Sequence, residues 1–140
     1  MSAILRQASF DDIAGMRKVR ESVHENRLTS TRIADADYLR AIGADGRGWV
    51  IEIQSKIVAF AVGSSVTGNI WALFVHPDHE GRGYGRRLHD VMIDWLFTQG
   101  AQRLWLTTDP DTRAQRFYES AGWRFVGRTD FGELRYELDK

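Results

Sequence analysis

Three glycines alternate in the segment 76–87, which reads His-Pro-Asp-His-Glu-Gly-Arg-Gly-Tyr-Gly-Arg-Arg. Gly81, Gly83 and Gly85 lack a Cβ atom, so a bulky anion can reach the backbone there, and each can adopt a positive φ angle. A helical pattern follows, so unpaired amides and the positive end of the helix dipole are expected to meet in this turn. Arginines add positive charge beside it, at Arg82, Arg86 and Arg87. This combination predicts a phosphate-binding turn.

Other phosphate loops are excluded by their spacing. A dinucleotide-binding fingerprint requires G-x-G-x-x-G, but counted from Gly81 and Gly83 the last position holds Arg86. Counted from Gly83 and Gly85, that position holds Leu88. The chain also has no G-x-x-x-x-G-K segment, so the Walker pattern fails. The alternative for these glycines is a tight strand-to-helix turn without a ligand.

The composition limits the class of protein. A chain of 140 residues with 43% apolar and 27% charged side chains predicts a single domain over residues 1–140. Because 19 basic and 19 acidic residues cancel, no long-range field attracts nucleic acid or an anionic membrane, and an anion site must be local. The absence of cysteine excludes disulfides, thiolate metal sites and a cysteine nucleophile.

No segment of the chain resembles a targeting or membrane-spanning sequence. Residues 1–6 lack a basic stretch followed by a signal-length apolar run, and the longest apolar run, residues 57–62, is too short for a bilayer. We therefore expect a cytoplasmic protein without a membrane partner.

Hydrophobic periodicity predicts the elements that must position the turn. Strands are predicted over residues 3–7, 49–54, 57–64, 69–76, 104–107, 123–127 and 133–138. Helices are predicted after an S-x-x-D cap at Ser9, over residues 35–42 and 83–99, and around residues 114–121, the last capped by Asp109 or Asp111. This order predicts an α+β fold with a largely antiparallel sheet.

Two segments carry a family resemblance. Residues 75–88, with Glu80-Gly81-Arg82-Gly83-Tyr84-Gly85 at their centre, resemble the acyl-CoA-binding motif of the GNAT superfamily of N-acyltransferases, (Q/R)-x-x-G-x-(G/A). Residues 111–123 resemble the later segment N-x-x-A-x-x-F-Y-x-x-x-G-F of that family. The resemblance implies a GNAT-like fold: a mixed, mostly antiparallel sheet of roughly six or seven strands, with about four helices on both faces. Glu80 departs from the usual Gln or Arg, and Asp111 from the usual Asn.

The resemblance also implies a cofactor site. The strands containing residues 73–75 and 104–107 are expected to splay apart, with the pantetheine arm of acetyl-CoA along the first strand and its phosphates on residues 80–86. The implied acyl-CoA-binding residues are Leu73, Phe74, Val75, Glu80, Gly81, Arg82, Gly83, Tyr84, Gly85, Arg86, Asp111 and Phe117.

The implied reaction is acetyl transfer from acyl-CoA to a primary amine by direct attack in a ternary complex. An amine of pKa about 10.4 is neutral in roughly one molecule in two and a half thousand at pH 7, which corresponds to about 4.6 kcal/mol. Deprotonation is therefore the costly step, whereas a thiol of pKa about 8.5 leaves readily. Tyr118 matches the tyrosine of the family and is the candidate general acid, although its spacing also suits a core aromatic. An amide of residues 74–75 is the candidate oxyanion donor.

The general base is open. Some family members carry a glutamate at the start of the central strand, where this chain has Asn69. Glu52, His24, Glu25 or a water chain are the candidates. His76 and His79 flank Pro77 without helical i, i+4 pairing, so no metal is expected.

Three functional classes are compatible with the sequence. The first is an N-acetyltransferase acting on a small-molecule or peptide amine, with a homodimer compatible with such a fold. The second is a non-catalytic acyl-CoA-binding module, because Asn69 cannot act as a carboxylate base and Glu80 puts a negative charge beside the expected diphosphate. The third is a nucleotide-binding α/β domain, which the failed spacings disfavour.

Overall fold

The computed structural model describes residues 2–23 and 33–140. Its helices and strands follow one another along the chain in the predicted order, which confirms the α+β class. They are β1 (Ala3–Gln7), the 3-10 helix η1 (Phe10–Asp12), α1 (Ile13–Ser22), α2 (Asp35–Ile42), β2 (Gly46–Ile53), β3 (Lys56–Ser64), β4 (Ile70–Val75), the 3-10 helix η3 (Pro77–His79), α3 (Tyr84–Thr98), β5 (Arg103–Thr108), α4 (Arg113–Ser120), β6 (Arg124–Arg128) and β7 (Leu134–Asp139). None of the described helices has the length and apolar character needed to cross a bilayer.

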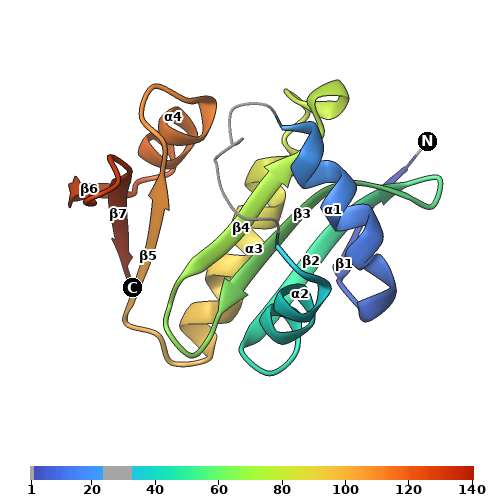
Figure 1. The fold of residues 1–140 in the computed structure, drawn as a ribbon, viewed down its shortest axis with the longest axis horizontal. Coiled ribbons are helices and arrows are strands. Elements are labelled where there is room, and N and C mark those ends of the chain that lie inside the picture. The colour runs from blue at the N-terminus through green and yellow to red at the C-terminus, as the bar shows by residue number, and fades with distance from the viewer. Residues whose placement is uncertain (1, 24–32) are drawn as a thin grey trace.

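The strands form two antiparallel sheets (Figure 1). The first has the order β1-β2-β3-β4 and the second the order β5-β7-β6. The sheets meet at a parallel bridge between Asn69 and Trp105, where the Trp105 amide donates to the Gly68 carbonyl at 3.0 Å. Beyond this bridge, no ladder in the described part of the chain joins β4 to β5, and the two strands diverge. The expected sheet is thus divided, and β4 keeps one edge without a strand neighbour.

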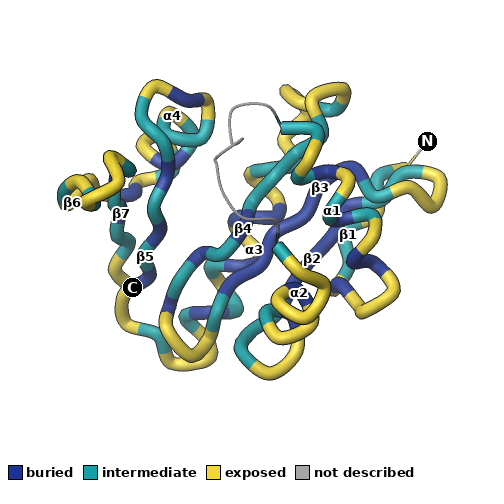
Figure 2. The backbone as a smooth tube through the Cα atoms, viewed as in Figure 1, coloured by how far each residue is buried: buried dark blue, intermediate teal, exposed yellow. Residues whose placement is uncertain are grey.

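Helices cover both faces of the first sheet (Figure 1). α1 and α2 lie on one face and α3 lies on the other. Alternation along β2 explains this layering, because successive side chains point to opposite faces of a strand. Val50 packs with Met16 and Tyr38 in the α1/α2 layer. The neighbouring side chains of β2 pack in the α3 layer, together with buried residues of the second sheet. Figure 2 shows buried stretches in both sheets.

The glycine turn opens α3 as the sequence predicts. Gly83 is the N-cap residue of α3 and has a left-handed backbone, with φ +83° and ψ 7°. Gly81 has a φ of +77°. A residue with a Cβ atom adopts such angles only at a cost, so both positions favour glycine.

The predicted cap of α4 was wrong. Thr112 caps this helix, because its backbone is extended (φ −111°, ψ 164°) and its hydroxyl accepts a hydrogen bond from the Gln115 amide at 3.1 Å. Asp111 has a φ of +62° and precedes the cap, and Asp109 lies further upstream. The pattern Thr-x-x-Gln at residues 112–115 is the capping signal that indicates the correct residue.

Candidate acyl-CoA site

A pocket of about 290 Å³ lies between the end of β4, the glycine turn and α4. Most of the predicted cofactor residues line it, and so does the proposed acid Tyr118. The predicted residues at its wall are Leu73, Phe74, Val75, Glu80, Gly81, Gly83, Tyr84, Gly85, Arg86, Phe117 and Tyr118. Arg82 and Asp111 do not line it, although both belong to segments that do. The pocket therefore joins the two sequence motifs in one site.

The glycines of the turn are open toward this pocket. A Cβ atom built on Gly81 or Gly83 would meet no protein atom within 4 Å. A Cβ atom on Gly85 would make only an ordinary contact of 3.6 Å with Val75. Protein packing therefore does not require glycine at these positions, and the space beside the backbone is available to a ligand.

The amides of residues 81–86 have no hydrogen-bond acceptor among the described residues. The preceding amide, of Glu80, donates to the Pro77 carbonyl at 3.4 Å, and the following one, of Arg87, donates to the Gly83 carbonyl at 3.1 Å. These donors lie at the amino terminus of α3, where the helix dipole favours negative charge. The turn can therefore hold a diphosphate through its main chain.

Charged side chains surround the turn. Glu80 lies 3.6 Å from Nε of Arg113 in an ion pair that connects the loop to α4. The acidic residue that departs from the family pattern thus has a cationic partner at the pocket. Arg86 pairs with Asp90 at 3.2 Å, and Arg82 contacts Nδ1 of His79 at 3.3 Å.

Tyr118 is a buried residue of α4 with an exposed fraction of 6%. Its ring packs against Phe117 and Trp123 in T-shaped contacts with centroid distances of 5.3 and 5.6 Å. Burial raises the pKa of Tyr118 well above its usual value, so the phenol stays protonated. Tyr118 therefore combines the core packing expected from its spacing with a position at the pocket wall.

No candidate base that lies within the described residues lines this pocket. Glu52 is absent from its wall, and its carboxylate accepts a hydrogen bond from Nε of Arg6 at 2.8 Å. Arg6 also holds Asp12 with both terminal nitrogens at 2.8 Å. Asn69 donates to the Trp105 carbonyl at the bridge between the sheets. His24 and Glu25 lie outside the described residues.

Neither of the two loop histidines has the surroundings of a metal ligand. Nδ1 of His76 accepts a hydrogen bond from the Asp78 amide at 3.1 Å and so caps the short helix η3. Across residues 2–23 and 33–140, no group of three or more His, Asp or Glu side chains could hold an ion.

Sequence patterns do not predict every residue of the pocket wall. Spacing gave no signal for Val23 at the end of α1, for His79, or for Arg113. Ala114 was noted only as part of the second motif. Their roles depend on how distant elements pack, which a linear motif does not encode.

Comparison with known proteins assigns the family. The model of the acetyltransferase (GNAT) family matches residues 13–123, a span that contains both motifs and the whole pocket wall. The chain belongs to the GNAT acetyltransferase family.

Two curated relatives of this chain are longer than it is. It is similar to the L-2,4-diaminobutyric acid acetyltransferase of Nocardia farcinica, with 27% identity over 118 residues, 81% of this chain and 60% of that protein. It is also similar to the mycothiol acetyltransferase of Beutenbergia cavernae, with 38% identity over 63 residues, 44% of this chain and 21% of that protein. The chain thus spans 60% or less of the length of these two relatives.

The GNAT fold itself is shared with solved structures over the whole chain. The PaiA N-acetyltransferase of Thermoplasma acidophilum, solved in complex with coenzyme A, superposes with a TM-score of 0.84 at 15% identity and covers 100% of both chains. At this identity the likeness shows the fold alone.

Proposed function

We propose that this GNAT-family chain transfers an acetyl or other short acyl group from acyl-CoA to a primary amine, by direct attack in a ternary complex. One observation carries the proposal: the unpaired amides of residues 81–86 lie at the amino terminus of α3, beside an open pocket. Main-chain donors and a helix dipole suit the diphosphate of coenzyme A. Acyl-CoA would supply the activated thioester.

Other walls of the pocket offer contacts for the pantetheine arm and the thioester of acyl-CoA. The free edge of β4 offers backbone groups at residues 73–75, to which the amide-containing pantetheine arm can pair as an added strand. An amide in this segment would stabilise negative charge on the reacting carbonyl oxygen. Tyr118 would donate its proton to the departing thiolate from its position at the pocket wall.

The acceptor must lose a proton before it attacks, and a water chain is the base that best agrees with the described residues. Glu52 is occupied by Arg6, and Asn69 has no carboxylate. A non-catalytic acyl-CoA-binding module is the second candidate. It is favoured because, among the described residues, the only carboxylate in the pocket wall is that of Glu80, which pairs with Arg113.

Two measurements separate these functions. Thiol release from acetyl-CoA is followed over a panel of small amines and peptides that includes 2,4-diaminobutyrate, the acid in the name of the Nocardia relative. Isothermal titration of coenzyme A, ATP and NAD is run in parallel. Amine-dependent release supports the transferase. Binding of coenzyme A without release for any amine would establish the module, and tighter binding of ATP or NAD would overturn the site.

A further inference from the structure

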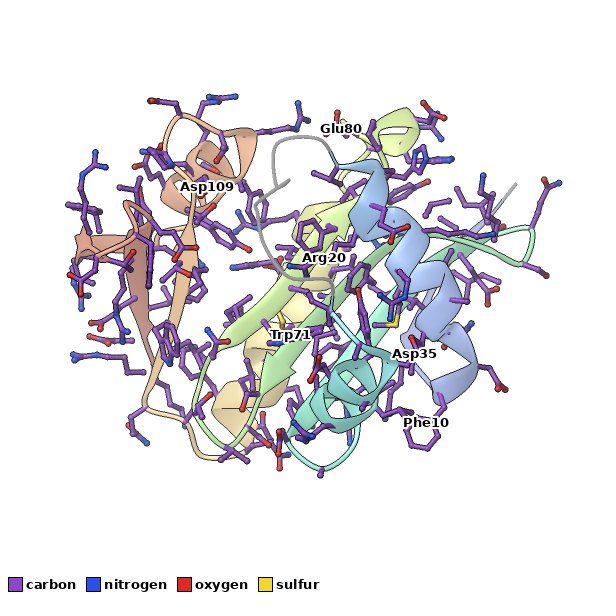
Figure 3. All side chains as sticks on the ribbon, viewed as in Figure 1. Phe10, Arg20, Asp35, Trp71, Glu80 and Asp109 are labelled. Carbon is purple, nitrogen blue, oxygen red and sulfur yellow. The ribbon has the colours of Figure 1, made fainter. Side chains whose placement is uncertain are left out.

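Two buried polar atoms have no hydrogen-bond partner among the described residues: Nη1 of Arg20 on α1 and the hydroxyl of Tyr38 on α2. Both side chains pack on the same indole. The Tyr38 ring makes a T-shaped contact with Trp71 at 5.2 Å, and the Arg20 guanidinium lies 5.9 Å above the Trp71 ring. Figure 3 shows Arg20 and Trp71 on the face of the first sheet that α1 covers. Two helices thus bring unsatisfied donors to one aromatic surface.

The neighbouring arginines are satisfied, which makes Arg20 an exception. Arg17, one turn earlier on α1, donates to the Ile33 carbonyl at 2.5 Å and pairs with Asp35. Arg6 holds two carboxylates, those of Asp12 and Glu52. Burial lowers the pKa of Arg20, and no carboxylate of the described residues offsets this effect. A buried guanidinium nitrogen without a hydrogen-bond partner is costly even where the group stacks on aromatic rings, so its retention points to a ligand that supplies the missing acceptor.

Arg20 lines neither the acyl-CoA pocket nor a second cavity, but it packs on one ring from the wall of each. Its guanidinium lies 4.8 Å above the ring of Phe74, which lines the acyl-CoA pocket. Trp71, the other ring beneath it, lines a cavity of about 340 Å³ between α2 and the ends of β3 and β4. Val23, three residues after Arg20, also reaches the acyl-CoA pocket. An anion held by Arg20 would therefore lie near the ring of Phe74, a residue of the strand segment along which the pantetheine arm is placed in our proposal.

We propose that Arg20 and Tyr38 bind a carboxylate of the acceptor, so that the acceptor class is an amine that also carries a carboxylate. The proposal rests on the function proposed above and names its substrate class. A guanidinium presents a planar set of donors that matches a carboxylate, and the Tyr38 hydroxyl adds one more donor. Because the binding group is separate from the reacting amine, the acceptor is held at two points.

Matched acceptors test this assignment. The rate of thiol release is compared for 2,4-diaminobutyrate, its carboxamide and 1,3-diaminopropane, and for lysine, lysinamide and cadaverine. The wild-type protein is expected to prefer each acid over its amide by about tenfold or more in kcat/KM, the scale of a charge-assisted contact. Arg20→Met and Tyr38→Phe should reduce this ratio toward one, because they lower kcat/KM for the acids and leave kcat/KM for the amides unchanged.

Lys18→Met is the matched control, because it removes an exposed cation from the same helix. It should leave both the midpoint of urea unfolding and the acid-to-amide ratio unchanged. Arg20→Met should be at least as stable as the wild type, since it removes an uncompensated buried cation. If Arg20→Met fails to fold, Tyr38→Phe, which deletes a single oxygen, carries the test.

A binding measurement distinguishes failure of this inference from failure of the proposed function. Nγ-acetyl-2,4-diaminobutyrate and its carboxamide are titrated into the protein with coenzyme A present, and binding is measured by calorimetry. Carboxylate-selective binding that Arg20→Met abolishes supports the assignment even if no amine is acetylated. An acid-to-amide ratio near one in the wild type, in both turnover and binding, would overturn it while leaving amine acetylation intact.

Discussion

The indole Nε1 of Trp123 donates a hydrogen bond to Nε2 of His89 at 3.0 Å, inside the protein. An indole nitrogen can only donate, so Nε2 of His89 is unprotonated and its proton is on Nδ1, which faces Asp90 at 2.8 Å. His89 also makes a T-shaped contact with Phe117 at 5.5 Å. The pair therefore connects α3 to the end of α4, the two helices that border the acyl-CoA pocket.

Stability should fall on mild acidification because of this pair. Burial lowers the pKa of His89, so the folded state favours the neutral ring, while the unfolded chain binds a proton near pH 6.5. The contribution is complete above that pH and is lost as the pH falls below it, by at most about 1.4 kcal/mol per pH unit. Urea unfolding of wild type and His89→Gln at pH 7.5 and 5.5 measures it. An equal loss in both proteins would exclude His89 as the cause.

Gly83→Glu should weaken coenzyme A binding by at least about tenfold, because the side chain fills the turn and places a negative charge beside the diphosphate. Gly132→Glu is the matched control. Gly132 has a φ of +82°, against +83° for Gly83, and equally open space around its Cβ position, but it does not line the pocket. Calorimetric titration should show a loss only for Gly83→Glu. Equal affinities for the two variants would contradict the site.

Tyr118→Phe should lower kcat by about tenfold or more and spare the affinity for coenzyme A, because it removes a proton donor but keeps the ring. Tyr136→Phe serves as the control, since its hydroxyl donates to Glu119 at 2.5 Å and is not part of the pocket wall. Steady-state rates and titrations of both variants provide the comparison. A normal kcat for Tyr118→Phe would leave Tyr118 with a packing role alone.

Glu80→Gln should tighten coenzyme A binding, by about two- to tenfold at low salt. The substitution removes a negative charge beside the predicted diphosphate, and the gain should shrink as salt screens the interaction. Asp78→Asn removes the same charge from a side chain that is 83% exposed and outside the pocket wall. The ratio of Kd values between the two variants, measured at two salt concentrations, tests whether the effect depends on the position of the removed charge. Weaker binding by Glu80→Gln would mean that the carboxylate assists the ligand.

Local signals predicted most of the fold. The bounds of β1 and α2 coincide with the predicted ones, because strand propensity and the closing Gly43 are properties of neighbouring residues. The glycine turn was also predictable, since the missing Cβ atoms and the following helix lie in one short segment. The cap at Thr112 was missed because the unusual backbone of Asp111 shifts the start of α4 by one residue.

Long-range contacts could not be read from the sequence. The family resemblance implied that the strands with residues 73–75 and 104–107 splay apart, but no local signal predicted the bridge between Asn69 and Trp105, 36 residues apart, at which the two sheets meet. The sequence alone leaves Glu52 as a candidate base, whereas in the structure its carboxylate accepts a hydrogen bond from Arg6, 46 residues away. Arg20 belongs to no recognised sequence motif. Its nitrogen is left without a hydrogen-bond partner only by the packing of two helices on β4.

The free edge of β4 has a further consequence for handling the protein. Backbone donors and acceptors of β4 that no strand of the described residues covers can pair with a strand of another molecule. Samples without coenzyme A should therefore self-associate at lower concentration than samples with it, and adding the ligand during purification should keep the chain monodisperse.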